Sequence, residues 1–191
     1  MTPKMCSVRG IGDTKVGPGL GEALNPKAVT MSSLSGVTAA RDAAMNGKSV
    51  LLVDDHSEAG GALYRSTSII EGLPVQEWID SQLVNFAAAG GRIELNATAF
   101  GVFDHKMVGI CQERGFGKAP SLMRVRATQI ILATGAIDRT VTFANNDRPG
   151  VMSLDAATEF LARYGVLIGQ NVTILASHAH FLRCKQALKP L

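Results

Sequence analysis

The sequence has few cysteines and no long hydrophobic run. Only three of its 191 residues are cysteine, and Cys6, Cys111 and Cys184 lie far apart in the chain. A small disulfide-stapled domain needs a denser and even-numbered set. No apolar run reaches the roughly 18 residues of a membrane span, and the first ten residues lack the apolar core of a secretory signal. We therefore expect reduced thiols, a cytoplasmic location and no contact with a membrane.

Charged and aromatic residues are also sparse. Charged residues make up 18% of the sequence, aromatic residues make up 5%, and the net charge is only +3. Hydrophobic residues make up 46%, so the composition excludes an intrinsically disordered chain. The basic residues are scattered and do not alternate with aromatic ones, which argues against a nucleic-acid partner. The length suits about one domain of ordinary size.

Glycine and proline punctuate the beginning of the chain. Residues 1–28 show no persistent period of 2 or 3.6, and we expect them to form an irregular N-terminal segment. Within them, Gly17-Pro18-Gly19-Leu20-Gly21 superficially suggests a phosphate loop. No apolar strand precedes this run and no amphipathic helix follows it, so we do not interpret it as one.

A regular pattern begins near residue 28 and predicts an α/β protein. A strand over 28–31, a small-residue turn over 32–36, a helix over 37–46 and a continuous apolar strand over 49–53 have the size of a βαβ unit. Two later apolar strands predict that the sheet is parallel, and an alternating region predicts a small antiparallel meander. The later elements are expected at 75–89 (helix), 92–96 (strand), 98–112 and 122–127 (meander strands), 129–133 (strand), 153–164 (helix), 171–176 (strand) and 179–188 (helix).

The turn of the βαβ unit is where a dinucleotide-binding motif would stand. The pattern G-x-G-x-x-G permits a tight turn, close approach of a pyrophosphate and close packing of helix on strand. Here its three positions hold Met31, Ser33 and Gly36, so only the third glycine is present. The hydroxyls of Ser32, Ser33 and Ser35 offer donors to a phosphate instead.

The end of the second strand carries an acid in the position of a ribose ligand. Asp54 follows Gly36 by 18 positions, close to the spacing at which an acidic residue accepts hydrogen bonds from the ribose of a dinucleotide. An acid at that place also disfavours a 2′-phosphate. The alternative is that Asp54 and Asp55 merely form a polar strand end and that Ser32–Ser35 is a plain turn.

Several longer segments carry a family resemblance. The run from Val50 to Asp55, followed by Gly60-Gly61, resembles the second strand and loop of FAD-dependent pyridine-nucleotide-type oxidoreductases, and Ile131-Leu132-Ala133-Thr134-Gly135-Ala136 resembles their A-T-G segment. Thr98–His105 and Phe143–Met152 narrow the resemblance. These two segments are similar to the α subunit of heterotetrameric sarcosine oxidase and to related amine and opine dehydrogenases.

The resemblance, which covers roughly residues 29–176, implies a Rossmann-like FAD/NAD(P)-binding domain over 29–150. Residues 151–191 would begin a second nucleotide-binding-like region that is incomplete at the C-terminus. The implied activity is oxidation of a secondary amine or amino acid through bound FAD, or alternatively NAD, together with partner subunits. The implied cofactor contacts are Ser32, Ser33, Leu34, Ser35 and Gly36 at the pyrophosphate, Asp54, Asp55 and Gly61 at the ribose end, Thr98 and Ala99 beside the adenine, and Ala133, Thr134 and Gly135 along the dinucleotide.

Other readings remain open at this point. The fold of such a subunit is also compatible with a non-catalytic remnant or assembly module, or with an NAD-binding regulatory domain. No catalytic acid or base is assigned, because the cofactor itself performs the redox chemistry in such enzymes. No metal site is expected: His178, His180 and Cys184 lack a fourth ligand. Asp104 and His105, as neighbours in a strand, would point to opposite faces, and the run 145–150 is interpreted as a structural turn.

Overall fold

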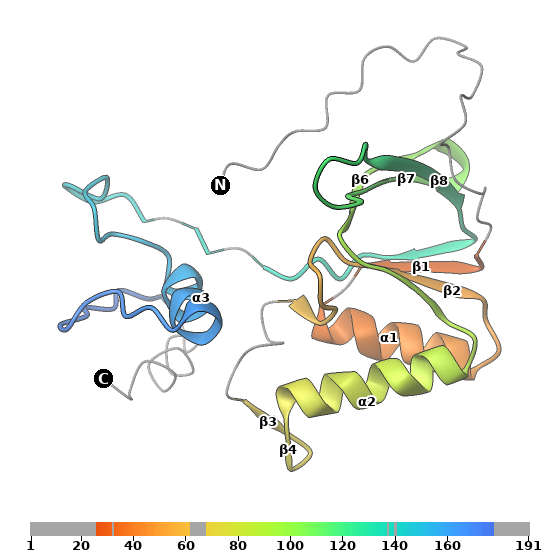
Figure 1. Ribbon diagram of the computed structural model, residues 1–191, viewed down its shortest axis with the longest axis horizontal. Helices are drawn as coiled ribbons and strands as arrows, with labels where there is room; N and C mark the ends of the chain where they lie inside the picture. Colours follow the sequence, from red (N-terminus) through yellow and green to blue (C-terminus); the bar gives the residue numbers. More distant parts are fainter. Residues whose placement is uncertain (1–25, 32, 62–67, 137, 140, 178–191) are drawn as a thin grey trace, which may run out of the picture.

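The computed structural model describes residues 26–31, 33–61, 68–136, 138–139 and 141–177. The described chain forms a parallel sheet, two small antiparallel sheets and three α-helices (Figure 1). The elements, in chain order, are β1 (Ala28–Met31), α1 (Leu34–Met45), β2 (Val50–Val53), β3 (Ile69–Ile70), β4 (Leu73–Pro74), α2 (Val75–Ala88), β5 (Arg92–Glu94), β6 (Ala97–Phe103), β7 (Met107–Gln112), β8 (Ser121–Arg126), β9 (Gln129–Ile131) and α3 (Leu154–Tyr164).

The central sheet has the strand order β5-β2-β1-β9, and all of its pairs are parallel. Ala28 pairs with Val50 on one side and with Gln129 on the other, so β1 lies inside the sheet. Every residue of β2 is buried, as expected for a strand of a parallel sheet covered on both faces. The sequence analysis predicted this sheet, and the observed β9 is shorter than its expected range, ending at Ile131.

Alternate residues of the sheet face two separate cores. Leu51 and Val53 pack against the antiparallel strands, whereas Val50 and Leu52 pack against α1 and Phe86 of α2. This division follows from the two-residue period of a strand, which sends successive side chains to opposite faces. The sheet is therefore the middle of three layers, with α1 and α2 on one face and the meander on the other (Figure 1).

The predicted meander is present as the three-stranded sheet β6-β7-β8. The expected strand region 98–112 is divided by a tight turn at Asp104–Lys106, in which His105 and Lys106 both have positive φ angles of 57° and 55°. The inward side chains of Val108, Ile110 and Val125 are fully buried. Period-2 alternation thus predicted the buried face of the meander but not the turn that separates its first two strands.

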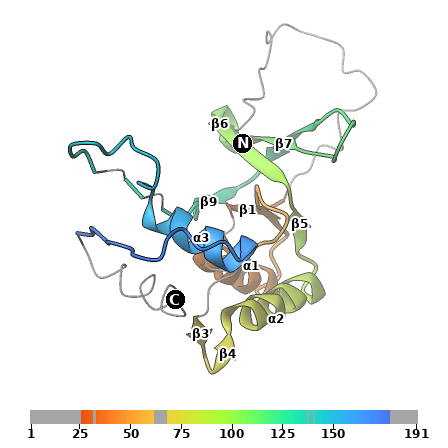
Figure 2. The same ribbon diagram turned by 60° about the vertical axis from the view of Figure 1, so that its left-hand side comes forward.

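Helices α1 and α2 lie beside each other under the sheet (Figures 1 and 2). Val75, Trp78 and Ile79 at the beginning of α2 form a small core with Leu34 of α1. A two-stranded hairpin, β3-β4, leads into α2 and was not predicted from the sequence. Its strands have only two residues each, which is too short for a periodic pattern to be recognised.

The chain after β9 forms turns and then α3. Helix α3 begins after the cap Ser153, whose Oγ accepts from the N–H of Ala156, and ends at Gly165 in the left-handed conformation, as predicted. The run 145–150 consists of turns. The strand predicted over 171–176 is not formed: these residues pair with no described strand and are mostly exposed. A short apolar run cannot form a strand without a neighbour to satisfy its backbone groups.

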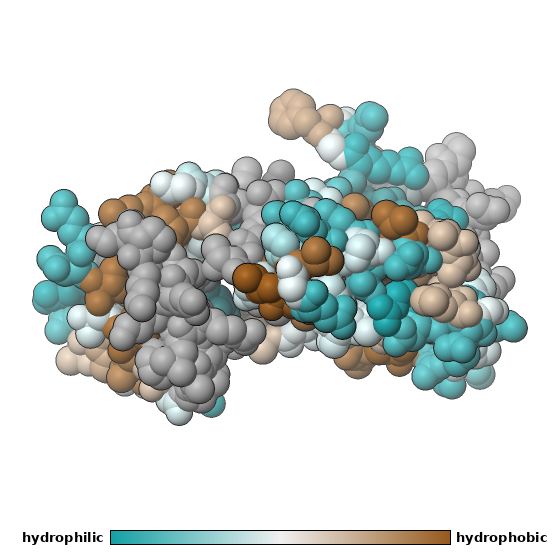
Figure 3. All heavy atoms as spheres, turned by 90° about the horizontal axis from the view of Figure 1, so that it is seen from below, coloured by the Kyte–Doolittle hydropathy of each residue, from teal (hydrophilic) through white to brown (hydrophobic). Residues whose placement is uncertain are grey.

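Many apolar side chains of this later part are exposed. Figure 3 shows hydrophobic surface over the left-hand part of the molecule, where this segment lies. Among the described helices, none combines the length and the hydropathy needed to cross a bilayer. The exposed apolar residues of this part include Val141, Phe143, Val151, Met152, Phe160, Tyr164, Leu167, Val172 and Leu175.

Candidate functional site at the carboxyl ends of the parallel strands

The first turn of α1 is built around Ser33. Its backbone is extended, its Oγ accepts a hydrogen bond from the N–H of Gly36 at 3.4 Å, and its carbonyl oxygen accepts from the N–H of Val37 at 2.9 Å. These contacts make Ser33 the N-cap. The helix therefore begins at Leu34, three residues earlier than predicted. The small residues predicted to form a turn are helical from Leu34 onward because Ser33 caps the first turn of the helix.

Two backbone donors at this helix end have no described acceptor. The N–H groups of Leu34 and Ser35 belong to the first turn, where no carbonyl precedes them within the helix, and no described group accepts from them. The Ser35 Oγ lies 2.9 Å from the Ser33 Oγ. Free N–H groups and the positive end of the helix dipole favour an anion at this place. Ser32 lies outside the described residues.

Gly36 is required by packing. A Cβ added at this position would collide with the carbonyl oxygen of Met31 and would lie 3.2 Å from the Cβ of Ala133. The glycine thus allows α1 to lie directly against the end of β1, which is the packing role of the third glycine of a dinucleotide-binding motif. The contact with Ala133 also brings the predicted A-T-G segment beside the beginning of α1.

Asp54, directly after β2, is buried with one oxygen lacking a partner. Its side chain is 1% exposed. Its Oδ1 accepts from the backbone N–H of His56 at 2.8 Å, whereas its Oδ2 has no partner among the described residues. A buried carboxylate oxygen without a donor is costly. The orphaned oxygen fits a hydroxyl donor such as that of a ribose, so the residues present pass this test for a dinucleotide.

The backbone of Asp54 joins two neighbouring elements. Its N–H donates to the carbonyl of Glu94 at 3.0 Å, and its carbonyl accepts from the N–H of Ala97 at 2.8 Å. The second bond holds the start of β6 against the end of β2. Thr98 and Ala99 follow immediately: Ala99 packs against the core under the meander, and Thr98 is exposed. The predicted adenine-side residues are thus adjacent in space to the predicted ribose ligand.

The remaining predicted residues are more exposed. Thr134 and Gly135 are exposed after β9, and Gly61 is half-buried with a φ angle of 66°. Asp55 is 63% exposed, and its carboxylate lies 2.9 Å from the His56 Nδ1. The structure therefore unites Ser33–Gly36, Ala133 and Asp54 around the ends of three parallel strands, with Asp55 at the outer side.

His56 is the residue that sequence reasoning missed. Its backbone N–H holds one oxygen of Asp54, and its ring lies 3.3 Å from the same oxygen. The run Asp54-Asp55-His56 also places three potential metal-ligand atoms within 4.8 Å of one another. The ring and Asp55 are exposed, and contacts within the run engage them. The signal available from the sequence was the D-D-H tripeptide itself.

Two other candidates from the sequence are not part of this site. Asp104 and His105 lie in the turn between β6 and β7, where His105 has a positive φ, so the expectation of opposite faces in a strand was wrong. His178, His180 and Cys184 lie outside the described residues.

The sequence matches known proteins in its central part. It is 36% identical over 155 residues to the sarcosine oxidase subunit alpha of Corynebacterium sp. (strain P-1) and 32% identical over 153 residues to that of Rhizobium meliloti (strain 1021). The chain is similar in sequence to a part of sarcosine oxidase α subunits. Each match covers 75% of this chain but only 16% of the relative, so the chain spans about a sixth of the length of these proteins. No family model matches the sequence.

A solved structure supports the same relationship. L-proline dehydrogenase from P. horikoshii superposes with a TM-score of 0.65 and 26% sequence identity, covering 78% of this chain and 30% of that chain. The chain therefore has the Rossmann-like fold of FAD/NAD(P)-binding oxidoreductases, with its parallel sheet and antiparallel meander. The resemblance found from sequence motifs is confirmed.

Proposed function

We propose that this chain binds the ADP moiety of FAD at the carboxyl ends of β1 and β2. The single observation that supports this most strongly is the buried, unpartnered Oδ2 of Asp54. A ribose hydroxyl would supply its missing donor. The free N–H groups at the beginning of α1 would face the pyrophosphate. When bound, the flavin supplies the hydride or electron transfer.

The dinucleotide-binding domain of this proposal is the segment 29–150. Its residues would bind and orient the cofactor: Ser33–Gly36 at the pyrophosphate, Asp54 at the ribose, Thr98 and Ala99 at the adenine and Ala133–Gly135 along the dinucleotide. NAD is the alternative occupant, since FAD and NAD share the ADP moiety. A 2′-phosphate would meet the carboxylate of Asp54, which disfavours NADP.

We further propose that the chain serves an enzyme that oxidises a secondary amine or amino acid with partner subunits. The relatives are named as alpha subunits of sarcosine oxidase, and the structural relative is named as an L-proline dehydrogenase. Both names concern amino acids with a secondary amine. No catalytic residue is assigned within this chain.

The visible spectrum of the purified chain tests the proposal. We expect flavin absorbance bands, or their appearance as FAD is titrated into the colourless protein. Replacing Asp54 with Asn removes an acceptor for the ribose, and we expect binding about tenfold weaker or more, because hydrogen bonds to charged groups contribute about 1.5–3 kcal/mol.

Asp42→Asn is the matched control, since it neutralises an exposed acid in the second half of α1 that is not among the proposed contacts, and it should leave the affinity within about twofold. Far-UV circular dichroism of both variants confirms that they fold. A folded wild-type chain that takes up neither FAD nor NAD contradicts the proposal and favours the non-catalytic assembly module. Uptake of NAD alone favours the regulatory domain.

A further inference from the structure

A hollow lies at the edge of the sheet opposite to the candidate nucleotide site. It has a volume of about 540 Å³ and is lined by Pro26, Lys27, His105, Lys106, Arg126, Ala127 and Thr128. Lys27 precedes β1 and Thr128 precedes β9, so the hollow stands at the amino ends of these strands. The candidate nucleotide site lies at their carboxyl ends. The hollow is shallow and open to solvent.

Among the described residues, the lining has basic side chains and no acid. Lys27, His105, Lys106 and Arg126 contribute four of its seven residues, and Asp104 is not among them. None of these four basic side chains forms an ion pair with a described carboxylate. Several like charges around one concavity raise the local concentration of anions. Pro26 and Ala127, which also line the hollow, are buried.

Two of these basic residues have a strained backbone conformation. His105 and Lys106 both have positive φ angles, which hairpin turns normally assign to glycine, asparagine or aspartate. Glycine would form this turn without strain. Backbone strain of this kind is concentrated at functional sites in proteins. Here the turn brings an imidazole and an ammonium group to the wall of the hollow.

Hydrogen bonds fix this wall. The Lys106 Nζ donates to the carbonyl of Thr128 at 2.7 Å, and the Thr128 Oγ1 donates to the carbonyl of Lys27 at 2.6 Å. The N–H of Ala127 donates to the carbonyl of Lys106 at 3.2 Å. The hairpin turn, the end of β8 and the beginning of β1 are thereby held together around the concavity. An ammonium group with three donors retains two after one such bond.

We propose that this hollow binds a small polyanion that carries two or more phosphate or carboxylate groups. The ammonium groups of Lys27 and Lys106 and the guanidinium of Arg126 would supply charge-assisted hydrogen bonds to such groups, and the His105 ring offers a further N–H donor. This site is separate from the proposed cofactor site.

The test titrates the full chain with pyrophosphate and, in a second arm, with citrate, by calorimetry in 150 mM NaCl. Saturable binding by one probe or by both supports the proposal and identifies phosphate, carboxylate or either as the recognised group. We expect Arg126→Gln and Lys27→Gln each to weaken binding about tenfold. Absence of saturable binding by both probes at millimolar concentration overturns the proposal.

Arg124→Gln is the matched control. Arg124 is exposed on the same strand as Arg126 and does not line the hollow, so its loss should leave the affinity within about twofold. An equal loss in Arg124→Gln indicates unspecific attraction by net charge and overturns the proposal. Binding that Ser33→Ala abolishes and that Arg126→Gln does not change places the probe at α1, and this result also overturns it. FAD uptake, read by flavin absorbance, tests the cofactor site independently.

Discussion

The carbonyl oxygen of Met31 occupies the place where a side chain on Gly36 would begin, so β1 and α1 meet at a contact that only glycine permits. We predict that Gly36→Ala destabilises the fold by about 1–3 kcal/mol, the usual cost of overpacking. Urea unfolding followed by circular dichroism measures the change. Ser35→Ala, in the same helical turn but exposed, should change the free energy of unfolding by less than about 0.5 kcal/mol. Equal stability of Gly36→Ala and wild type would show that the contact is not tight.

Ser33 both caps α1 and carries a Cβ where the motif has its second glycine. We predict that Ser33→Gly strengthens FAD binding several-fold, because a pyrophosphate can approach the backbone more closely, while stability falls by only a few tenths of a kcal/mol. Ser33→Ala retains the Cβ and loses the cap, so it should be less stable by about 1 kcal/mol without a gain in affinity. Fluorescence quenching of FAD measures the affinity. A gain of similar size in both variants would contradict the role given to the Cβ.

Phe86 on α2 is fully buried beside the strand residues Val50 and Leu52. Replacing it with Ala should cost about 3–5 kcal/mol through lost burial and the cavity that remains. Val84→Ala on the same helix removes a side chain that is 67% exposed and should have little effect. Thermal denaturation of both variants gives the comparison. Similar midpoints for the two variants would refute the packing of α2 against the sheet.

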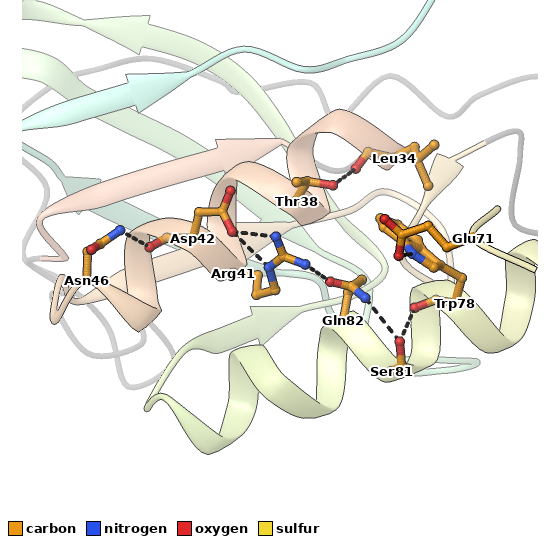
Figure 4. Close-up of polar contacts among 9 residues, drawn as sticks. All are labelled: Leu34, Thr38, Arg41, Asp42, Asn46, Glu71, Trp78, Ser81 and Gln82. Carbon is orange, nitrogen blue, oxygen red and sulfur yellow. Dashed lines mark hydrogen bonds and ion pairs between the residues drawn. The ribbon is translucent and has the colours of Figure 1, made fainter. Parts of the chain in front are cut away.

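A hydrogen bond from Arg41 to the Gln82 Oε1 joins α1 to α2, as Figure 4 shows. Gln82 also bonds to the Ser81 Oγ at 3.1 Å, and Ser81 bonds to the carbonyl of Trp78 at 2.6 Å. A double-mutant cycle of Arg41→Met and Gln82→Met should give a coupling energy of about 0.5–1.5 kcal/mol. Asp42→Asn alters only the exposed ion pair with Arg41, and it should lower the free energy of unfolding by less than about 1 kcal/mol. A coupling energy near zero would show that the two helices are held by apolar contacts alone.

The parallel sheet could be predicted because its strands carry their own signal. Val50–Val53 is apolar throughout, and its burial on both faces follows from that run. The place of Asp54 directly after this strand was predictable, but the unpartnered oxygen depends on His56 and on the approach of Ala97, which no local pattern contains.

The errors have a common physical cause. The start of α1 at Leu34 depends on the hydrogen bonds of Ser33. The turn at His105 and Lys106 requires a left-handed backbone conformation that is uncommon for residues other than glycine. The run 171–176 has a strand-like composition but no described neighbour with which to pair. Propensity describes a residue alone, whereas these outcomes are decided by its partners.

The pairing of Ala28 with Gln129 has a consequence for synthesis on the ribosome. When the βαβ unit has emerged, the edge of β1 that will receive β9 is still open, and Val29 and Leu51 lack the meander that later covers them. At about 5–20 residues per second, the segment 54–131 takes about 4–15 s to make. During that interval the nascent chain exposes an unpaired strand edge and an apolar sheet face, which are the surfaces through which incomplete chains aggregate.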